Sequence, residues 1–341
     1  MSDLSLPCSP APAAAAPLCV IPGLDGEGRP PHELHRSERV WVEKNCYADL
    51  WIGLLGALGH EPAACLGFTL GIDFLGDQWT FYKPSHDDLF LLYGIDVQEL
   101  TVWRPLIEHA REHLGAGRLI ATEADAWWLP DTAGTDYRRQ HTKTTVVLNA
   151  LDEAGERLGY FHNAGYHQLE GEDFRRTFAL GPDAPAPLMP FFAEIIDLRQ
   201  RVEHEGPALR QLARGLLPRA LRRRPADNPV ERFARRYQHD LPGLQQRGLA
   251  HYHAWAFAAT RQLGSAAELA AHHLRWLEGA QTGPLHQAAD GFQEVATLAK
   301  TFILKGARAV ASGRPFADGE LLERMSVAWS AAMQAVDHRP A

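Results

Sequence analysis

The spacing of apolar residues divides the chain into a mixed region and a helical region. Over residues 40–182, short β-branched runs alternate with helical stretches, which is typical of an α+β domain. Beyond the proline-rich segment 182–187 this alternation disappears, and apolar residues recur with the period of an α-helix. The sequence therefore predicts an α+β domain over 40–182, followed by an all-helical domain over 188–338.

The second domain is predicted to be a helical bundle without an internal repeat. Its expected helices cover residues 189–217, 229–239, 249–280, 284–311 and 318–336. Ahead of the first domain, residues 1–39 are rich in proline, alanine and glycine. We expect them to form a flexible N-terminal segment.

Cys46 stands where a predicted helix begins. Asn45 is a suitable N-cap, and apolar residues from Tyr47 to Leu58 keep helical spacing until Gly59 ends the run. A helix N-terminus carries partial positive charge and free N–H groups, so a thiolate is stabilised there. The segment alone leaves a second possibility open, because free cysteine is often a small buried core residue.

A β-hairpin is predicted downstream of Cys46. One strand covers 141–151 with His141 at its entrance, and its partner over 157–162 ends at Asn163. The entrance of the first strand and the exit of the second lie side by side in a hairpin, so we expect His141 next to Asn163. Cysteine, histidine and asparagine in this order are typical of papain-like catalysis, in which the amide orients the imidazole.

The first half of the chain resembles the butirosin-biosynthesis acyltransferase family. Those proteins are papain-like and move an acyl group from a carrier-protein thioester to an amine. The whole chain, with its helical second half, resembles more closely the bacterial domain-of-unknown-function family 1839, which is associated with amino acid:carrier-protein ligases. The residues that carry the resemblance are Cys46 at a helix start, Asp125 with Leu129 and Pro130, His141 before a strand, and Asn163.

The resemblance implies that Cys46 is the nucleophile and His141 the base. Asn163 takes the place where the acyltransferases usually have aspartate. Asparagine can orient an imidazole but cannot offset its positive charge, so His162 or Asp125 could share this task.

We expect the tetrahedral oxyanion to be stabilised by the N–H of Cys46 and the side chain of Asn45. The expected activity is transfer of an acyl group, in particular an aminoacyl group, from the phosphopantetheine arm of a carrier protein to an amine or hydroxyl acceptor. The arm is then a substrate, and no bound cofactor is expected. Two alternatives remain open: a cysteine peptidase or thioesterase with the same triad, and a non-catalytic module that binds carrier proteins.

The charge of the chain bears on its partners. A formal net charge of −8 disfavours general binding of nucleic acid. The one concentrated basic feature comprises Arg219, Arg222, Arg223 and Arg224. Such a cluster could dock an acidic carrier protein, and a solvated surface explains it equally simply.

Cysteine and histidine usage indicates an intracellular enzyme without a metal. The four cysteines show neither disulfide nor metal-site spacing, and no apolar segment approaches the ~20 residues of a membrane span. A three-histidine site from His141, His162 and His167 lacks a paired acidic ligand motif, so no metal is expected. Prolines and an early aspartate argue against a signal peptide, and we expect a cytoplasmic protein.

Overall fold

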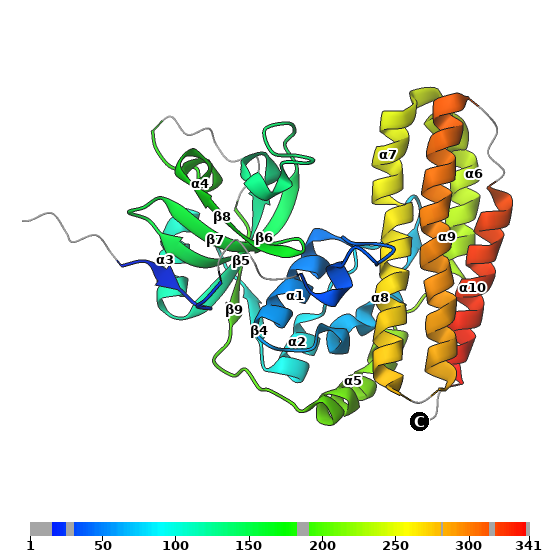
Figure 1. Ribbon diagram of the computed structural model, residues 1–341, viewed down its shortest axis with the longest axis horizontal. Coiled ribbons are helices and arrows are strands. Elements are labelled where there is room, and N and C mark those ends of the chain that lie inside the picture. Colours follow the sequence, from blue (N-terminus) through cyan, green and yellow to red (C-terminus); the bar gives the residue numbers. More distant parts are fainter. Residues whose placement is uncertain (1–15, 25–30, 183–190, 281, 314–317, 339–341) are drawn as a thin grey trace, which may run out of the picture.

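The computed structural model describes residues 16–24, 31–182, 191–280, 282–313 and 318–338. It confirms a mixed α+β architecture, with a sheet-containing domain followed by an all-helical domain (Figure 1). Helix α1 (Cys46–Ala57) lies between the sheet and the long helices of the second domain. No helix within the described ranges is both long and apolar enough to cross a membrane.

The central sheet is antiparallel, with strands in the order β4-β9-β5-β6-β7-β8 and β1 paired to β6. Its strands are β1 (Leu18–Cys19), β4 (Asp96–Glu99), β5 (Arg118–Asp125), β6 (Lys143–Asp152), β7 (Arg157–His162), β8 (Gly165–Glu170) and β9 (Ala193–Asp197). A separate small hairpin is formed by β2 (Phe74–Leu75) and β3 (Gln78–Trp79). The predicted hairpin of β6 and β7 is confirmed.

Two predictions are wrong for the region where the sheet domain ends and the helical domain begins. Strand β9 and helix α5 (Gly206–Leu221) replace the helix expected over 189–217, as far as that range is described. The five residues of β9 are too few to show the alternation of a strand in the sequence. The β-branched Ile195 and Ile196 nevertheless favour a strand there. Because β9 lies between β4 and β5, the sheet domain extends to Asp197 and does not end at 182.

The described part of the N-terminal segment is also folded, contrary to expectation. Strand β1 pairs with β6, and the short 3₁₀ helix η1 (Glu33–His35) buries Leu34 and His35. Apolar residues such as Leu18 pack on the sheet even though the surrounding composition is typical of a tail. Residues 1–15 and 25–30 lie outside the described part.

The sheet separates two cores. Alternate residues of each strand face opposite sides, so Ala121, Val147 and Phe161 pack with α1, whereas Ile120, Val146 and Tyr160 pack on the other side. The α1 side also holds the 3₁₀ helix η2 (Pro62–Gly71) and α2 (His86–Tyr93). Helices α3 (Leu106–Gly115) and α4 (Gly171–Thr177) cover the opposite side, with η3 (Ala126–Trp128) and η4 (Pro130–Thr132) nearby.

The helical domain follows the predicted pattern with two differences. Its helices are α5, α6 (Pro229–Arg247), α7 (Leu249–Ala258), α8 (Thr260–Glu278), α9 (Pro284–Ser312) and α10 (Gly319–Asp337). The helix expected over 249–280 breaks at Ala259, and α6 continues past Pro242 beyond the expected end at 239. Helices α8, α9 and α10 run side by side (Figure 1).

Helix α8 anchors the segment that leads into α1. The buried carboxylate of Glu268 accepts the N–H groups of Val40 at 2.9 Å and Trp41 at 3.0 Å. The indole N–H of Trp41 donates to the carbonyl of Ala296 in α9 at 3.2 Å. The indole ring lies against Gly264, where an added Cβ would be 2.5 Å from a ring atom. The two domains are therefore joined directly before Cys46.

A second buried network holds the last residues before α1. The Lys44 N–H donates to Asp49 at 2.7 Å, and the other oxygen of Asp49 meets Nε2 of His35 at 3.0 Å. The Lys44 ammonium donates to the carbonyl of Leu34. Burial lowers the pKa of Lys44 to about 8, although Asp49 opposes this effect. This network fixes the direction in which α1 begins.

The close fit of Trp41 against α8 can be tested with two glycine substitutions. Gly264→Ala should lower the free energy of unfolding by roughly 1–3 kcal/mol, because the new Cβ collides with the indole ring. Gly215→Ala is the matched control in α5, with nothing within 4 Å, and should raise stability by about 0.5–1 kcal/mol. Chemical denaturation measures both. Equal effects would contradict a tight contact at Gly264.

His273 of α8 makes the domain contact sensitive to acid. Its Nδ1 donates to the carbonyl of Ala63 in η2 at 2.7 Å. Burial lowers the pKa of His273 from 6.5 to about 4, and the hydrogen bond to Ala63 opposes this shift more weakly. The unfolded chain therefore takes up a proton near pH 6.5 that the folded protein binds only near pH 4.

As the pH falls from 6.5 to 4, His273 should lower the free energy of unfolding by about 3 kcal/mol. His273→Asn keeps a donor for the Ala63 carbonyl and removes this titration, so its stability should depend less on pH in that window. Denaturant titrations at several pH values measure the difference. The exposed His253→Asn is the control. An unchanged pH dependence in His273→Asn would rule out this contribution.

Candidate functional site

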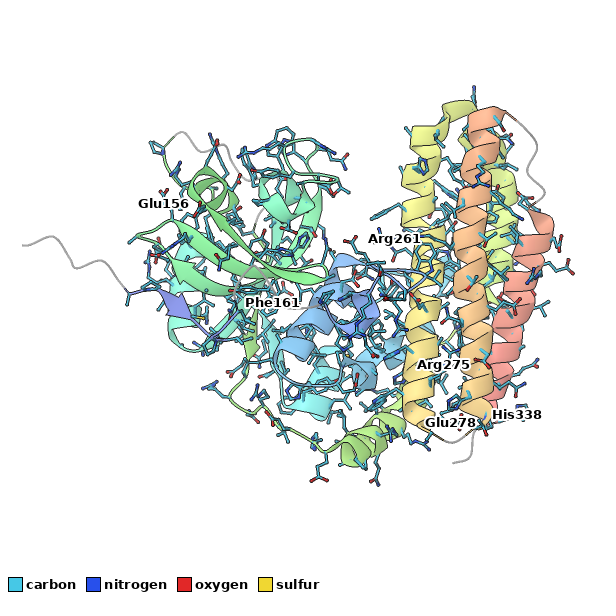
Figure 2. The ribbon with its side chains drawn as sticks, in the orientation of Figure 1. Glu156, Phe161, Arg261, Arg275, Glu278 and His338 are labelled. Carbon is cyan, nitrogen blue, oxygen red and sulfur yellow. The ribbon has the colours of Figure 1, made fainter. Side chains whose placement is uncertain are left out.

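A cavity of about 910 Å³ lies between the two domains, where α1 begins and the strands of the sheet end. Its wall from the sheet domain includes Cys46, Tyr47, Glu123, Asp131, Thr144, Thr145, His162, Asn163 and Glu194. The helical domain contributes Phe257, Arg261 and Gln262. Arg261 lies on the side of the helical domain that faces the sheet domain (Figure 2), and its guanidinium is 3.7 Å from Glu43.

Asn45 positions Cys46 as the first residue of α1. Its side-chain oxygen accepts the N–H of Ala48 at 2.8 Å, which caps the helix as predicted. Its amide nitrogen donates to the carbonyl of Tyr82 at 3.0 Å. Both polar atoms of the Asn45 side chain are thus bound within the protein, and the residue acts first as a helix cap.

Cys46 differs from the other described cysteines in its surroundings. It is half-buried and lines the cavity. The buried Cys65 donates to the carbonyl of Pro62 at 3.3 Å, and burial raises the pKa of its thiol to about 12. Cys19 is exposed on β1, and Cys8 lies outside the described residues. Among the described cysteines, Cys46 is therefore the one that lines this cavity.

The structure does not bring His141 to Cys46. Nδ1 of His141 is 2.6 Å from Asp125, and its ring stacks on Trp127 with centroids 4.5 Å apart. Its side chain is 52% exposed, and His141 is absent from the cavity wall. In the hairpin, His162 pairs with Val146, so β7 ends well before it reaches the level of His141. Asp125 therefore binds the imidazole of His141, which is one of the two possibilities that the sequence left open.

Asn163 lies on the α1 side of the sheet. Its φ of 46° forms the turn between β7 and β8, and its carbonyl would be 3.9 Å from a Cβ added at Gly53 of α1. Asn163 lines the cavity, but within the described residues it makes no hydrogen bond to His141. Of the three expected catalytic residues, Cys46 and Asn163 share the cavity and His141 stands apart.

The cavity wall contains a buried chain of three side chains, Thr144, His162 and Asp131, which the sequence did not predict. We call this chain the relay. The Thr144 hydroxyl is 2.7 Å from Nε2 of His162, and Nδ1 of the same ring is 2.5 Å from Asp131. The Asp131 carboxylate accepts the hydrogen of Nδ1, so in the neutral ring Nε2 accepts the hydrogen of the Thr144 hydroxyl. This order of hydroxyl, imidazole and carboxylate is that of a proton relay. Asp131 directly follows Pro130, but no sequence spacing indicates its contact with β7.

The carboxyl group of Asp131 is ionised more easily than its burial alone would allow. Burial favours its neutral form, but hydrogen bonds from His162 and Tyr160 and the charges of His162 and His167 outweigh this, so the pKa of Asp131 lies below its usual value. The buried carboxylate in turn helps to raise the pKa of Tyr160, mainly an effect of burial. His167 is 3.8 Å from Asp131, whereas His141 pairs with Asp125. The three histidines thus do not form one cluster.

A second set of polar groups lies beside Cys46 on the α1 side. The Tyr47 hydroxyl donates to the buried Glu194 at 3.0 Å and is 3.1 Å from Nε2 of His86. Burial, followed by the charge of Glu194, raises the pKa of Tyr47 well above its usual value. The Lys83 ammonium lies 5.1 Å from the centre of the Tyr47 ring. Charges of both signs therefore surround Tyr47, and Glu194 and Lys83 line the same cavity as Cys46.

The predicted arginine cluster does not form a single free patch. Arg219 bonds Asp88 and lies 3.7 Å from Asp87, and Arg224 is 2.7 Å from Asp337. Arg222 and Arg223 are exposed and have no ion pair within the described residues. Two of the four arginines are thus neutralised by acidic groups of the chain itself.

Two family models together match nearly the whole chain. The DUF1839 N-terminal domain matches residues 30–197, and the DUF1839 C-terminal domain matches residues 206–338. These limits agree with the end of β9 and with the start of α5. No curated protein matches the chain.

The placement of the thiols predicts their reactivity. Iodoacetamide at neutral pH should label Cys46 in the folded protein at least about tenfold faster than Cys65, because only a thiolate attacks and the Cys65 thiol has a pKa of about 12. Mass spectrometry of peptides gives both rates. Labelling in urea is the control and should make the two rates similar. Equal labelling in the folded protein would contradict the assignment.

Proposed function

The chain belongs to the DUF1839 family, and we propose that its interdomain cavity is an acyl-transfer site in which Cys46 is the nucleophile. The acyl group comes from the phosphopantetheine thioester of a carrier protein and passes to an amine or hydroxyl acceptor. One observation carries this proposal: the cavity that receives Cys46 at the start of α1 also contains the relay of Thr144, His162 and Asp131.

The first step forms a thioester on Cys46. The thiolate attacks the carbonyl carbon of the incoming thioester, and the bond from that carbon to the pantetheine sulfur breaks, so pantetheine leaves as a thiolate. The oxyanion of the intermediate faces the first N–H groups of α1, which a helix leaves without internal acceptors. Each such donor contributes about 3 kcal/mol in related chemistry.

The second step transfers the acyl group to the acceptor. The acceptor attacks the Cys46 thioester, and the carbon–sulfur bond breaks to restore the thiolate. The acceptor proton passes to the Thr144 hydroxyl while the proton of that hydroxyl passes to Nε2 of His162, and the negative charge of Asp131 stabilises the imidazolium. In this scheme the thiol and the imidazole act from different walls of the cavity, with the substrates between them. Asp131 then supplies the charge that Asn163 lacks.

The charges in the cavity favour an aminoacyl group. Five carboxylate residues line the wall: Glu43, Glu123, Asp131, Asp136 and Glu194. Three basic residues also line it: Lys83, Lys143 and Arg261. Lys143 is bound to Glu123 at 2.5 Å, and Arg261 lies near Glu43. Asp131 is bound to His162 and Tyr160, which leaves Asp136 and Glu194 without a lysine or arginine partner within the described residues. These two carboxylates suit an ammonium group on the acyl chain.

A non-catalytic module that binds carrier proteins is the second candidate. Within the described residues, the Cys46 sulfur has no hydrogen bond to an imidazole, and the relay belongs to the opposite side of the sheet from α1. A protein that only holds the phosphopantetheine arm would need the cavity but not the thiol. Substitution of Cys46 separates the two functions.

Incubation with an aminoacyl carrier protein should give an acyl adduct on Cys46, seen by mass spectrometry. Cys46→Ser should abolish the thioester adduct, and Cys19→Ser, at an exposed cysteine outside the cavity, should not. Thr144→Val removes the hydroxyl of the relay and keeps the side-chain shape. It should slow transfer to the acceptor by about 10²-fold or more, so the adduct accumulates.

Each outcome of this experiment has a definite meaning. If carrier protein binds but no adduct forms, the non-catalytic module is correct. If the adduct forms and is released as free acid without an acceptor, the activity is hydrolytic. If Thr144→Val leaves the decay of the adduct unchanged, the relay takes no part in the second step.

A further inference from the structure

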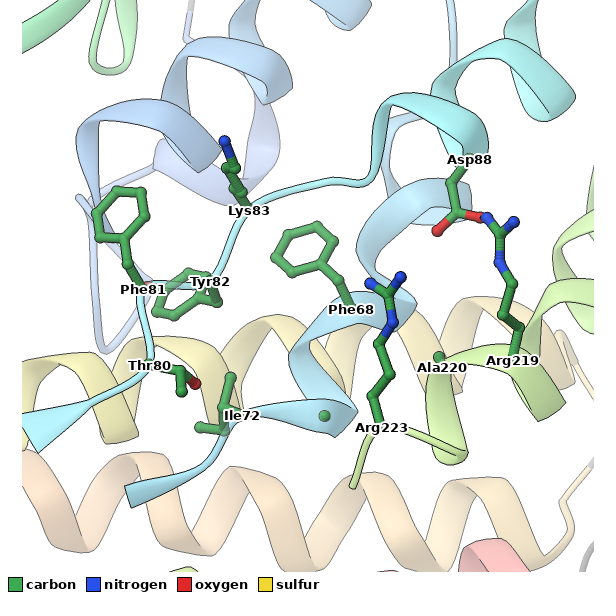
Figure 3. A pocket seen from close by; sticks show the side chains of 11 residues that line it. Phe68, Ile72, Thr80, Phe81, Tyr82, Lys83, Asp88, Arg219, Ala220 and Arg223 are labelled. Carbon is green, nitrogen blue, oxygen red and sulfur yellow. The ribbon is translucent and has the colours of Figure 1, made fainter. Parts of the chain in front are cut away.

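A second, smaller cavity lies next to the Cys46 cavity. It has a volume of about 210 Å³ and lies between α5 and the segment 80–83 (Figure 3). Arg219 in the last turn of α5 and Arg223 in the turn that follows this helix line one side of it. Phe68 and Phe81 provide apolar surface on the other side.

The two arginines differ in the charge they can offer. The Arg219 guanidinium meets the carboxylate of Asp88, as Figure 3 shows, and Asp87 is also near. Arg223 lies two residues beyond the end of α5 and has no ion pair within the described residues. Its Cβ would be 3.2 Å from a Cβ added at Gly71, so the base of this side chain is held closely against η2. Of these two arginines, Arg223 is therefore the one whose positive charge is available to a ligand.

The two cavities share a wall. Phe81 and Lys83 line both of them, and the Lys83 ammonium lies over the ring of Tyr47, the residue after Cys46. Phe81 is exposed, so a chain-like ligand can pass over its ring. A path from Arg223 to the thiol thus begins at a cation, crosses aromatic surface and passes a second cation at Lys83.

We infer that the smaller cavity binds the phosphate group of a phosphate ester whose flexible arm extends past Phe81 into the Cys46 cavity. This inference rests on the proposed function, for which it identifies the substrate as a phosphopantetheine thioester. Arg223 binds the phosphate oxygens, the side chains of Phe68 and Phe81 pack against the arm, and Lys83 adds positive charge where the two cavities meet. An arginine fork matches phosphate geometry, which suits this role.

The inference can be tested with two ligands that differ only in the phosphate. Calorimetry should show phosphopantetheine binding about tenfold or more tightly than pantetheine. Arg223→Gln should remove this difference, whereas Arg222→Gln should retain it. Arg222 is the matched control, since it is the adjacent exposed arginine and does not line the cavity. Equal affinity for the two ligands in the unaltered protein, or equal effects of the two substitutions, would overturn the inference.

The source of the phosphate ester is tested with a carrier protein that bears the arm. If it competes with free phosphopantetheine, and Arg223→Gln weakens both, the ligand is the arm of a carrier protein. If Arg223→Gln weakens only the free compound, the cavity serves a free phosphate ester.

A thioester without phosphate separates this inference from the proposed function. Acyl-N-acetylcysteamine should acylate Cys46 equally in the unaltered protein and in Arg223→Gln. If acylation occurs but the phosphate gives no advantage in binding, the transfer proposal stands and the phosphate site is wrong. If Arg223 controls phosphopantetheine affinity but no adduct forms, the phosphate site stands and the transfer proposal fails.

Discussion

The position of Cys46 depends on the buried carboxylate of Glu268. A carboxylate in the interior is stable only when it is well hydrogen-bonded, and here the N–H groups of Val40 and Trp41 supply those bonds. They come from the other domain, so the same bonds that satisfy α8 also fix the chain that enters α1. Since Phe257 and Arg261 belong to the helical domain, the width of the cavity depends on this contact.

The cavity combines groups from both sides of the sheet because it lies where the strands end. Within the sheet, alternation would separate the α1 side, with Asn163, from the opposite side, with Thr144 and His162. At the strand ends both sets border the same space. A substrate there can meet a thiol on one wall and an imidazole on another, which is the arrangement that the proposed transfer in two steps requires.

Local sequence patterns predicted the individual elements of this site, but they did not predict the contacts between those elements. The capped helix at Cys46 and the hairpin of β6 and β7 follow from capping and spacing, which act over a few residues. The position of His141 depends on the exact register, and the contact between Asp131 and His162 joins residues 31 positions apart without any periodic signal. Strand β9 was missed because its place between two other strands is set by tertiary pairing.

The structure also changes the meaning of Asn163. Its neutral amide raised the question of which group could balance a charged imidazole, and Asp125 and His162 were the named alternatives. Asp125 does hold an imidazole, but that of the exposed His141. In the cavity wall, the carboxylate that pairs with an imidazole is Asp131. His162 and Tyr160 keep it charged despite its burial. Asn163 is then free to serve as a turn residue with positive φ, a conformation that asparagine tolerates well.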